Sequence, residues 1–367
     1  MKKVILLNNT VCDKNDNCVI IKKTTGGGGG GGDTPSPSRP TYTGHADAEG
    51  LRAIGWTDED IAYYQENGVN WNEEDDQYHL VTEDNKALYG VVTATNISTY
   101  KDRIVYLPKI DTSSVTNMNQ MFYNCRSLVA IPKIDTSSVT NMSSMFRDCS
   151  ALVTIPQLDT SSVINMSYMF NNCRSLVTIP QLDTSSVTES MSSMFSNCSA
   201  LVTIPQLDTS SVTNMGDMFS NCSALVSIPQ LDTSSVTNMN QMFNSCQALV
   251  SIPQLDTSSV TDMDGLFYNC RSLVAIQKID ISSVTRMSNM FYLCYSLSTL
   301  KIQNINRAVW LDTANLLNKE SLLYIINNEA ATSAITITLA SYAYTRWAED
   351  ADVVAALANH PNISIAM

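Results

Sequence analysis

Residues 201–224 read LVTIPQLDTSSVTNMGDMFSNCSA, and near-copies of this stretch fill the centre of the chain. The motif DTSSV, written DISSV at its last occurrence, recurs eight times, and eight cysteines follow it in the same rhythm. Both series advance by 24 residues, with one step of 25 where Glu189 and Ser190 stand in place of a single residue. Copies at a fixed period predict a solenoid of stacked units. The motifs begin at Asp111, Asp135, Asp159, Asp183, Asp208, Asp232, Asp256 and Asp280, and the cysteines are Cys125, Cys149, Cys173, Cys198, Cys222, Cys246, Cys270 and Cys294.

Within one unit the apolar residues fall into two groups. The first group is compact and ends at Pro205, which favours a short strand followed by a bend. Asp208 opens the DTSS stretch, where a carboxylate accepts a hydrogen bond from the backbone two residues further on, in an Asx turn. The run from Met215 to Cys222 has the apolar spacing of one face of a helix. The sequence therefore predicts an α/β repeat solenoid with a short parallel strand and a helical turn in each unit.

The composition argues against several classes of protein. The chain of 367 residues has 22 basic and 35 acidic side chains, a net charge of −13, so it does not hold a nucleic-acid backbone by general electrostatics. With 44% apolar and 16% charged residues it has enough apolar surface for a packed core. Its three histidines, His45, His79 and His360, are too few for most acid–base, triad and zinc enzymes.

Neither a membrane span nor a classical signal peptide is evident in the sequence. The apolar run Val4–Leu7 is much shorter than the ~7–15 residues of a signal-peptide core. No stretch approaches the ~18 apolar residues of a membrane helix. We therefore expect no membrane insertion. An extracellular role then requires release as a virion component or non-classical export. Without either route, we expect the chain to be cytoplasmic.

The chain is predicted to contain six segments. Gly26–Gly32 is a run of seven glycines, which imposes no preferred dihedral angles and indicates a flexible linker. Cys12 and Cys18 flank the turn of a predicted hairpin, and both a disulfide and a free pair are compatible with the sequence. The segments are an N-terminal β-hairpin for attachment (1–23), a Gly/Pro/Ser linker (24–43), an acidic helical region (44–86), an N-terminal solenoid cap (87–106), the eight-unit solenoid (107–300) and a C-terminal α/β cap (301–367).

The last segment has a secondary-structure pattern of its own. Asn318 has the features of a helix N-cap, and the run AITITLA alternates like a strand. Because an open apolar end of a solenoid aggregates, this segment is interpreted as a cap. The predicted elements are a helix from Asn318 to Ile326, a strand over Ala334–Ala340, a helix over Ser341–Asn359 and a strand over Asn362–Ala366.

The residues that repeat unchanged are interpreted as core. Parallel stacking points the cysteine Cβ vectors the same way, and the array has no CxxC spacing, so we expect buried free thiols. The aspartate series lacks the Gly-rich nonapeptide of calcium-binding β-solenoids, so each carboxylate is expected to cap its own turn. The methionine and phenylalanine stripe is interpreted as core filler. No catalytic residue, cofactor or metal is expected.

The positions that vary from unit to unit are expected to face solvent and to carry any ligand contacts. No basic residue occurs between Arg174 and Arg271, where eight acidic residues lie, so the array is banded basic, acidic and basic. Tyrosines at variable positions supply amphipathic contact groups of the kind found in binding surfaces. The candidates are Tyr123, Arg126, Arg147, Tyr168, Arg174, Tyr268, Arg271, Tyr292 and Tyr295.

The pattern L-x-x-I-P-x-L-D-T-S-S-V-T-x-M-x-x-M-F-x-x-C-x-x-L resembles the BspA-like branch of leucine-rich repeats, the variety with a Met-Phe-x-x-Cys signature common in bacterial surface proteins. It extends from Leu107 to Leu300. The resemblance implies a solenoid used for adhesion or recognition outside the cell. The flanking stretches HADAEGLRAIGW, DIAYY, NKESLLYIINN, ITITLA and DADVVAAL are similar to segments of phage and prophage structural proteins of gut bacteria.

Three functions are compatible with these observations. The first is a non-enzymatic recognition or adhesion scaffold for a cell-surface glycan or protein. The second is a virion component, either a tail-associated receptor-binding protein or a purely structural decoration protein, joined to its assembly through residues 1–43. The third is a glycan-active enzyme, which needs two carboxylates ~5–9 Å apart, and stacked aspartates meet that requirement only by accident. We therefore expect a binding protein and not an enzyme.

Overall fold

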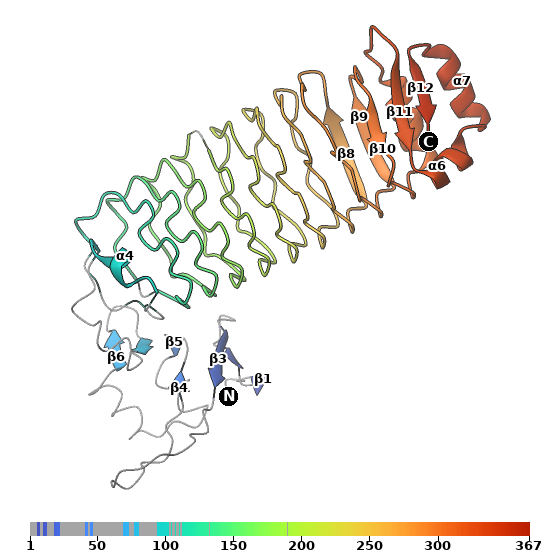
Figure 1. The fold of residues 1–367 in the computed structure, drawn as a ribbon. Coiled ribbons are helices and arrows are strands. Elements are labelled where there is room, and N and C mark those ends of the chain that lie inside the picture. Colours follow the sequence, from blue (N-terminus) through green and yellow to red (C-terminus); the bar gives the residue numbers. More distant parts are fainter. Residues whose placement is uncertain are drawn as a thin grey trace. The chain divides into compact units, whose positions relative to one another are not determined.

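The computed structural model describes residues 94–102, 104, 107, 110, 112–131, 133–188 and 190–367, together with the backbone of seven short strands between residues 6 and 80. The chain divides into two compact units (Figure 1). The N-terminal unit comprises Met1–Asp111 and Ser127–Ile134. The solenoid unit comprises Thr112–Arg126 and Asp135–Met367.

In the N-terminal unit, seven short strands form two antiparallel sheets, ordered β1-β2-β3-β4 and β5-β7-β6. β2 and β3 form a hairpin within residues 1–23, in a register that places Cys12 opposite Cys18 on the backbone. Thr41 and Tyr42, at the end of the predicted linker, pair with β3. The strands are β1 (Leu6–Leu7), β2 (Thr10–Cys12), β3 (Cys18–Lys22), β4 (Thr41–Tyr42), β5 (His45–Ala46), β6 (Val69–Asn72) and β7 (Gln77–Leu80).

Among the residues described before the array, one stretch is helical. The helix expected within residues 44–86 lies outside the described residues. Within the segment predicted as the N-terminal cap, α4 (Ile97–Tyr100) is a single helical turn that buries Ile97. In the part of the chain that the structure describes, no helix combines the length and the apolar character needed to cross a membrane.

The solenoid unit is a stack in which equivalent residues of successive repeats pair in parallel. Isolated parallel bridges join the residue before the first methionine of neighbouring units. Within the described array, extended strands occur only near its end, where β8 (Ala275–Asp280) pairs in parallel with β9 (Thr299–Gln303). The predicted α/β repeat solenoid is confirmed, with a bridge in place of a strand in most units. The bridged residues are Asn117, Asn141, Asn165, Ser190, Asn214, Asn238, Asp262 and Arg286.

The segment from the first methionine to the cysteine of each unit, which we call the turn segment, is a run of three overlapping β-turns where the sequence predicts a helical turn. In the unit quoted above, the amides of Met218 and Cys222 donate to the carbonyls three residues earlier, at 3.2 and 3.0 Å. The third residues of these turns, Asp217 and Asn221, have φ of 57° and 61°. That left-handed value at the third residue belongs to a type II turn and interrupts any helix.

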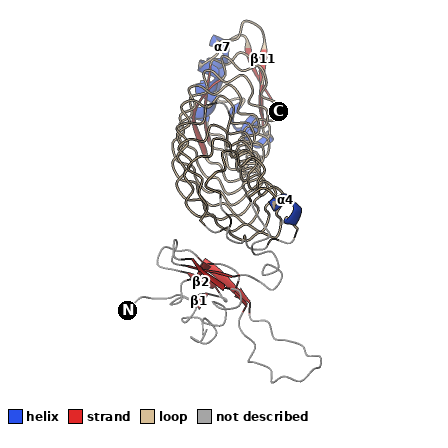
Figure 2. Cartoon of the chain, turned by 90° about the vertical axis from the view of Figure 1, so that its left-hand side faces the viewer, coloured by secondary structure: helices blue, strands red, loops and turns tan. Residues whose placement is uncertain are grey.

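The other amides of the turn segment reach the next unit. The amides of Met215 and Phe219 donate to the carbonyls of Asn238 and Met242, both at 2.9 Å. Amides thus alternate between their own turn and the neighbouring unit. A single unit leaves these donors without partners, so the backbone requires stacking as strictly as the apolar side chains do. Figure 2 shows the array drawn almost entirely as stacked loops, with strands and helices in the C-terminal region of the same unit.

The interior of the array is a set of residue columns. The eight phenylalanines, one per unit from Phe122 to Phe291, lie in a single column and are all buried. Their neighbouring ring centroids are 5.2 to 6.1 Å apart, and no two neighbouring planes differ by more than 10°. Leucine, isoleucine, valine, methionine and cysteine columns surround it, as in Leu201, Val212 and Cys222. The methionine, phenylalanine and cysteine columns are therefore core, as predicted, although the valine that follows each opening leucine repeats as regularly and is exposed from Val177 to Val274.

Residues 301–367 continue the parallel stacking with helices. Asn318 caps α5 as predicted, because its side chain accepts a hydrogen bond from the amide of Ser321. The single helix predicted over Ser341–Asn359 is wrong: α6 ends at Trp347, and Asp350 caps a separate α7 by accepting two amide hydrogen bonds. The elements are β10 (Val309–Leu311), α5 (Lys319–Asn327), β11 (Ile335–Leu339), α6 (Ser341–Trp347), α7 (Ala351–Asn359) and β12 (Ile363–Ala366), and the strands form a parallel sheet ordered β10-β11-β12.

Candidate ligand-binding surface

Three positions of each unit, in or directly after the turn segment, carry the nine candidate contacts. The pre-Met position precedes the second methionine, the post-Phe position follows the phenylalanine, and the post-Cys position follows the cysteine. Small post-Phe residues such as Ser196 and Ser220 are buried, which corrects the expectation that every variable position faces solvent. Seven candidates are exposed, and Arg147 and Tyr268 are half-buried. The pre-Met position holds Tyr168, the post-Phe position holds Tyr123, Arg147, Tyr268 and Tyr292, and the post-Cys position holds Arg126, Arg174, Arg271 and Tyr295.

Arg147 lies between two tyrosine rings, and we call Tyr123, Arg147 and Tyr168 the early cluster. The guanidinium carbon is 5.7 Å from the ring centroid of Tyr123 and 5.3 Å from that of Tyr168. Both distances fall in the range of cation–π attraction. The three residues come from three successive units and from two different positions, so the sequence identified each of them without indicating that they meet.

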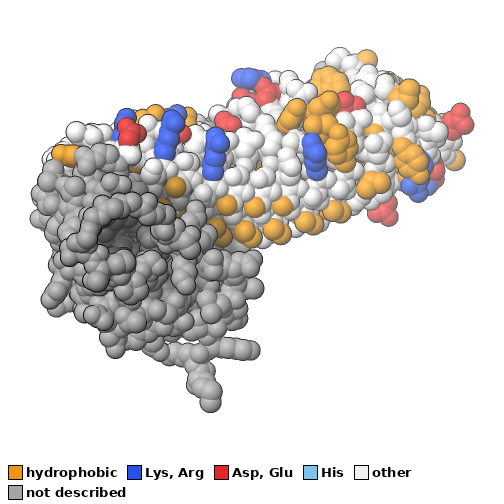
Figure 3. All heavy atoms as spheres, turned by 60° about the horizontal axis from the view of Figure 1, so that its bottom comes forward, with side chains coloured by type: hydrophobic (Ala, Val, Ile, Leu, Met, Phe, Trp, Pro, Cys, Tyr) orange, Lys and Arg blue, Asp and Glu red, His pale blue; other side chains and the backbone are white. Residues whose placement is uncertain are grey.

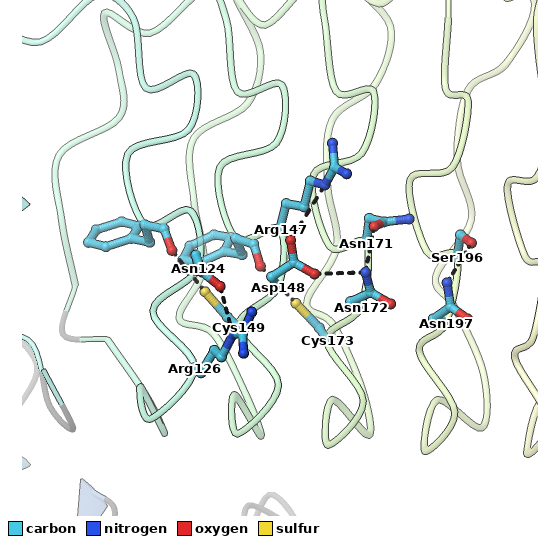
Figure 4. A network of polar contacts seen from close by, with 12 residues as sticks. Asn124, Arg126, Arg147, Asp148, Cys149, Asn171, Asn172, Cys173, Ser196 and Asn197 are labelled. Carbon is cyan, nitrogen blue, oxygen red and sulfur yellow. Dashed lines mark hydrogen bonds and ion pairs between the residues drawn. The ribbon is translucent and has the colours of Figure 1, made fainter. Parts of the chain in front are cut away.

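A polar network supports the early cluster from below (Figure 4). Nε of Arg147 is 3.6 Å from Oδ2 of Asp148. The other oxygen of Asp148 accepts a hydrogen bond of 2.7 Å from Nδ2 of Asn172, which also donates to the side chain of Asn171. Asp148 is therefore held in place by the next unit. The network thus places a carboxylate beside the Nε end of the Arg147 guanidinium.

Arg126 and Arg271 are held in the same way in different units. Nε of Arg126 donates to Oδ1 of Asn124 at 2.7 Å, and Nε of Arg271 donates to Oδ1 of Asn269 at 2.8 Å. Each asparagine is the left-handed residue of the last turn, with φ of 64° and 59°. The asparagine that the turn requires thus also orients the arginine two residues later. The terminal nitrogens of both arginines are left for solvent or a ligand.

Tyr268 and Tyr292 form a second group near the end of the array, which we call the late cluster together with Arg271. Their ring centroids are 5.5 Å apart with planes tilted by 34°. Arg174 and Tyr295 are exposed and contact no other candidate through an ion pair or ring contact that the described structure shows. The structure therefore brings five of the nine candidates into contact with one another, three in the early cluster and Tyr268 with Tyr292 in the late cluster, and the late cluster takes in Arg271 by its position in the same unit as Tyr268.

The charge bands of the sequence run along the array. Figure 3 shows basic side chains recurring along the face in view, with acidic ones beside some of them. Among the late bases, Arg286 is already neutralised, since its guanidinium lies 3.3 Å from Asp262 and 2.6 Å from Asp264. These two carboxylates raise the pKa of Arg286, with the Asp264 hydrogen bond as the largest cause. Arg286 is accordingly a structural ion pair.

The repeated aspartates cap turns, as predicted. The carboxylate of Asp232 accepts hydrogen bonds from the amide and hydroxyl of Ser234, at 3.0 and 2.7 Å. These two bonds hold the pKa of Asp232 below its ordinary value, and Asp183 and Asp256 behave alike with their own serines. A groove of about 600 Å³ passes over this turn in units around Asp232 and Asp256. In the described residues, no cluster of three or more His, Cys, Asp or Glu side chains is arranged to hold a metal.

The eight cysteines of the array are free and buried, as predicted. From Cys149 onward, each thiol donates to the carbonyl of the phenylalanine one unit earlier, as between Cys222 and Phe195 at 3.0 Å. Burial raises the pKa of Cys222 and Cys294 to about 12. The thiols are therefore a structural column and not nucleophiles.

A ridge of exposed valines runs along the array and was not among the predicted contacts. Each valine follows the buried leucine that opens a unit, and successive valines are joined by amide-to-carbonyl hydrogen bonds of 3.0 to 3.4 Å. The signal in the sequence was the recurring Leu-Val dipeptide. Neighbouring residues of an extended chain point to opposite sides, so a valine next to a buried leucine faces solvent. Figure 3 shows a row of apolar side chains along the array. The exposed members are Val177, Val202, Val226, Val250 and Val274, at 37% to 45% exposure.

Comparison with known proteins places the array in a family. Residues 93–203 and 189–306 match the family described as "Mycoplasma protein of unknown function, DUF285". These stretches together span more than half of the chain, and the protein belongs to this family. The parallel stacking of units that each open on a buried leucine makes it a protein of the leucine-rich-repeat type. No curated protein matches the chain.

Two solved structures are similar to this chain at low identity. A leucine-rich repeat protein of T. pallidum is 22% identical, with 59% of this chain and 78% of that chain covered and a TM-score of 0.30. A TLR13–ssRNA13 complex is 13% identical, with 67% of this chain and 41% of that chain covered and a TM-score of 0.21.

Proposed function

We propose that the protein is a non-enzymatic recognition scaffold whose array presents the early and late clusters to a glycan or protein on a cell surface. The observation that carries the proposal is the division of each unit into an unchanging interior and a varied rim. The phenylalanine and cysteine columns are buried throughout. Tyrosine and arginine are concentrated at both ends of the array, at positions where other units have serine or asparagine.

The two clusters have the composition of recognition surfaces. Tyrosine gives a large contact area at low cost in side-chain entropy, and arginine gives directional hydrogen bonds. Stacking and asparagine contacts already order Arg147 and Arg271 in the free protein. An ordered contact group loses less entropy on binding.

The setting that we propose is a surface or virion assembly. The Met-Phe-x-x-Cys signature resembles BspA-like bacterial surface proteins, and the flanks resemble phage structural proteins. Residues 1–43 then serve as the attachment segment, and 301–367 as the cap of the array. A tail-associated receptor-binding protein unites these features, while a purely structural decoration protein is the alternative. A surface protein encoded by the cell and a virion protein are distinguished by purifying phage particles. The virion role requires that the protein is found in them.

A catalytic role is less well supported by the carboxylates. A glycosidase needs one carboxyl group with a raised pKa as general acid. Serine hydrogen bonds lower the pKa of Asp183, Asp232 and Asp256. Desolvation raises the pKa of Asp217, but the equivalent positions of the adjacent units are Ser193 and Gln241. The repeat therefore supplies no acid with a second carboxylate at the matching position.

The experiment compares three variants of the full chain on a microarray of bacterial and host glycans and on intact bacterial cells. The early-cluster variant carries Tyr123→Ser, Arg147→Ser and Tyr168→Ser, and the late-cluster variant carries Tyr268→Ser, Arg271→Ser and Tyr292→Ser. Serine already occupies each of these positions in other units, so folding is preserved. The control variant carries Ser199→Ala, Ser223→Ala and Gln247→Ala in the middle units.

We expect the full chain and the control to bind, and at least one cluster variant to lose binding with an unchanged thermal midpoint. If the full chain binds no glycan and no cell, or if both cluster variants bind as well as the control, the array is a spacer. Function then resides in the flanking segments.

A further inference from the structure

The early cluster contains a guanidinium whose two ends have different environments. Nε of Arg147 is buried and has no hydrogen-bond partner in the described structure, since Asp148 stays at 3.6 Å. The whole side chain is nevertheless 40% exposed. Figure 4 shows the terminal nitrogens of Arg147 pointing away from the network. They form a fork of N–H donors at the end of the guanidinium opposite Asp148.

The tyrosines on either side make this fork rigid. Tyr123 and Tyr168 contact the guanidinium at 5.7 and 5.3 Å from their ring centroids, which restricts its rotation. They also remove water from its faces, which strengthens a charge-assisted hydrogen bond made at its edge. A planar, fixed pair of N–H donors matches the two oxygens of a carboxylate. Asp148 beside the fork compensates part of its charge and so favours a singly charged anion over a doubly charged one.

Basic groups recur once per unit around this fork. Arg126, Arg147 and Arg174 lie in three successive units, Arg126 and Arg174 at the post-Cys position and Arg147 at the post-Phe position. Successive units are 5.2 to 5.6 Å apart at the phenylalanine column there. A polymer that carries a carboxylate on each of several successive rings therefore offers acceptors to more than one of these arginines. Side-chain amides of Asn124 and Asn171 lie in the same turn segments and are suited to hydroxyl groups.

We propose that units one to three bind an acidic polysaccharide of the polyuronate type, with a sugar carboxylate held by the terminal nitrogens of Arg147. This inference rests on the proposed recognition function and names its ligand class. The exposed edges of Tyr123 and Tyr168 contact the sugar rings on either side of that carboxylate. The net charge of −13 disfavours non-specific attraction of a polyanion, so binding of such a polymer reports a local site.

The test measures binding of the full chain by isothermal titration calorimetry with polygalacturonate and with the same polymer after reduction of its carboxyl groups. Poly-L-glutamate serves as the peptide carboxylate. We expect binding to polygalacturonate, with an affinity at least about tenfold higher than for either other polymer. Equal binding of the reduced polymer overturns the proposal, and so does tighter binding of poly-L-glutamate.

Three variants locate the site. Arg147→Ser is expected to weaken polygalacturonate binding about tenfold or more, because it removes both charge and fork. Arg147→Lys keeps the charge but lacks the planar fork. Its affinity for polygalacturonate is expected to exceed that of Arg147→Ser by about threefold at most. Arg307→Ser is the matched control and should bind like the unchanged chain, because Arg307 lies outside both clusters and its Nε likewise donates to an asparagine, Asn306, at 3.1 Å. Wild-type affinity in Arg147→Ser or Arg147→Lys contradicts the assignment.

The outcome separates this inference from the proposed function. A chain that ignores polygalacturonate but binds other glycans or cells through either cluster remains a recognition scaffold, and only the ligand class is refuted. A chain that binds nothing on the microarray or on cells refutes both.

Discussion

In the array, most amides of a turn segment bond either within their own β-turns or to the next unit, whereas residues 301–367 pair their backbone in α5, α6, α7 and a parallel sheet. Both regions belong to one compact unit and both stack in parallel. The array depends on neighbours for hydrogen bonds as well as for apolar burial. The helices bond internally and bury one face. The array is therefore extendable by whole units, while the C-terminal region is suited to end the stack.

The largest expected effect comes from removing residues 301–367. The amide of Leu300 donates to Ser321 and that of Asn318 donates to the carbonyl of Ser298, so the last array unit depends on this region. Its loss exposes the open end of the apolar columns, and we expect aggregation in size-exclusion chromatography. Deleting 201–224 instead joins Ala200 to Leu225 and recreates the repeat, so a soluble folded protein is expected. Equal tolerance of both deletions contradicts the distinction between the regions.

The second prediction concerns pH. Burial raises the pKa of Cys222 and Cys294 to about 12, against about 8.5 for an unfolded thiol. The folded state disfavours the thiolate, so this contribution to stability is complete below the unfolded pKa and is lost as pH rises toward the folded one. Each such thiol costs about 1.4 kcal/mol of unfolding free energy per pH unit in that window.

Denaturant unfolding between pH 8 and pH 11 checks this dependence. Thiol titration of the native protein is the control. No cysteine follows Cys294, so every thiol that reacts lies in the array or before it. The eight thiols of the array should react only after unfolding. Rapid reaction of eight thiols in the native protein contradicts the buried column.

A single substitution in the phenylalanine column tests its packing. Phe219 is fully buried and stacks on Phe195 and Phe243 with centroids 5.7 Å away on both sides. Phe219→Ala leaves a cavity between two units and is expected to cost about 3–5 kcal/mol of unfolding free energy. The measurement is the denaturant midpoint. A loss below about 1 kcal/mol shows that the column closes up and is not a rigid stack.

The smallest effect is expected where the array meets the C-terminal region. Leu293 has φ of 63° at the position that other units fill with asparagine, aspartate or serine, and its amide donates to Thr313. A left-handed leucine costs roughly 1–2 kcal/mol, and asparagine tolerates that conformation better. Leu293→Asn should therefore raise the unfolding free energy by about 1 kcal/mol, and the reverse change Asn221→Leu should lower it by a similar amount. Loss of stability in Leu293→Asn shows that the leucine side chain packs against the C-terminal region strongly enough to outweigh its strain.

The period, the core columns and the aspartate turns were predictable because identical residues recur and have one environment each. The β-turns of the turn segment were not predictable from the apolar spacing. Successive type II turns bury Met215, Met218, Phe219 and Cys222 with the same spacing as a helix. The left-handed third residues were the available signal: Asn221 and its equivalents are mostly asparagine, which tolerates positive φ.

The candidate residues were predictable singly and not as clusters. Variation between units identified Tyr123, Arg147 and Tyr168, but the pre-Met and post-Phe positions become neighbours only through the stacking of type II turns. The end of α6 was missed because the apolar spacing continues across Asp350. The stretch DADVV contains an N-cap aspartate that marks a new helix.

The central claim, that the interior of the array specifies folding and its rim specifies binding, is tested by one variant of the full chain. All nine candidates are replaced by serine, the residue that other units carry at the pre-Met, post-Phe and post-Cys positions. Thermal unfolding and binding to the glycan microarray and to bacterial cells are measured on the same preparation. We predict a midpoint within a few degrees of the unchanged chain, since exposed cation–π contacts contribute only about 0.5–1 kcal/mol each, and loss of all binding. Undiminished binding by this folded variant contradicts the account.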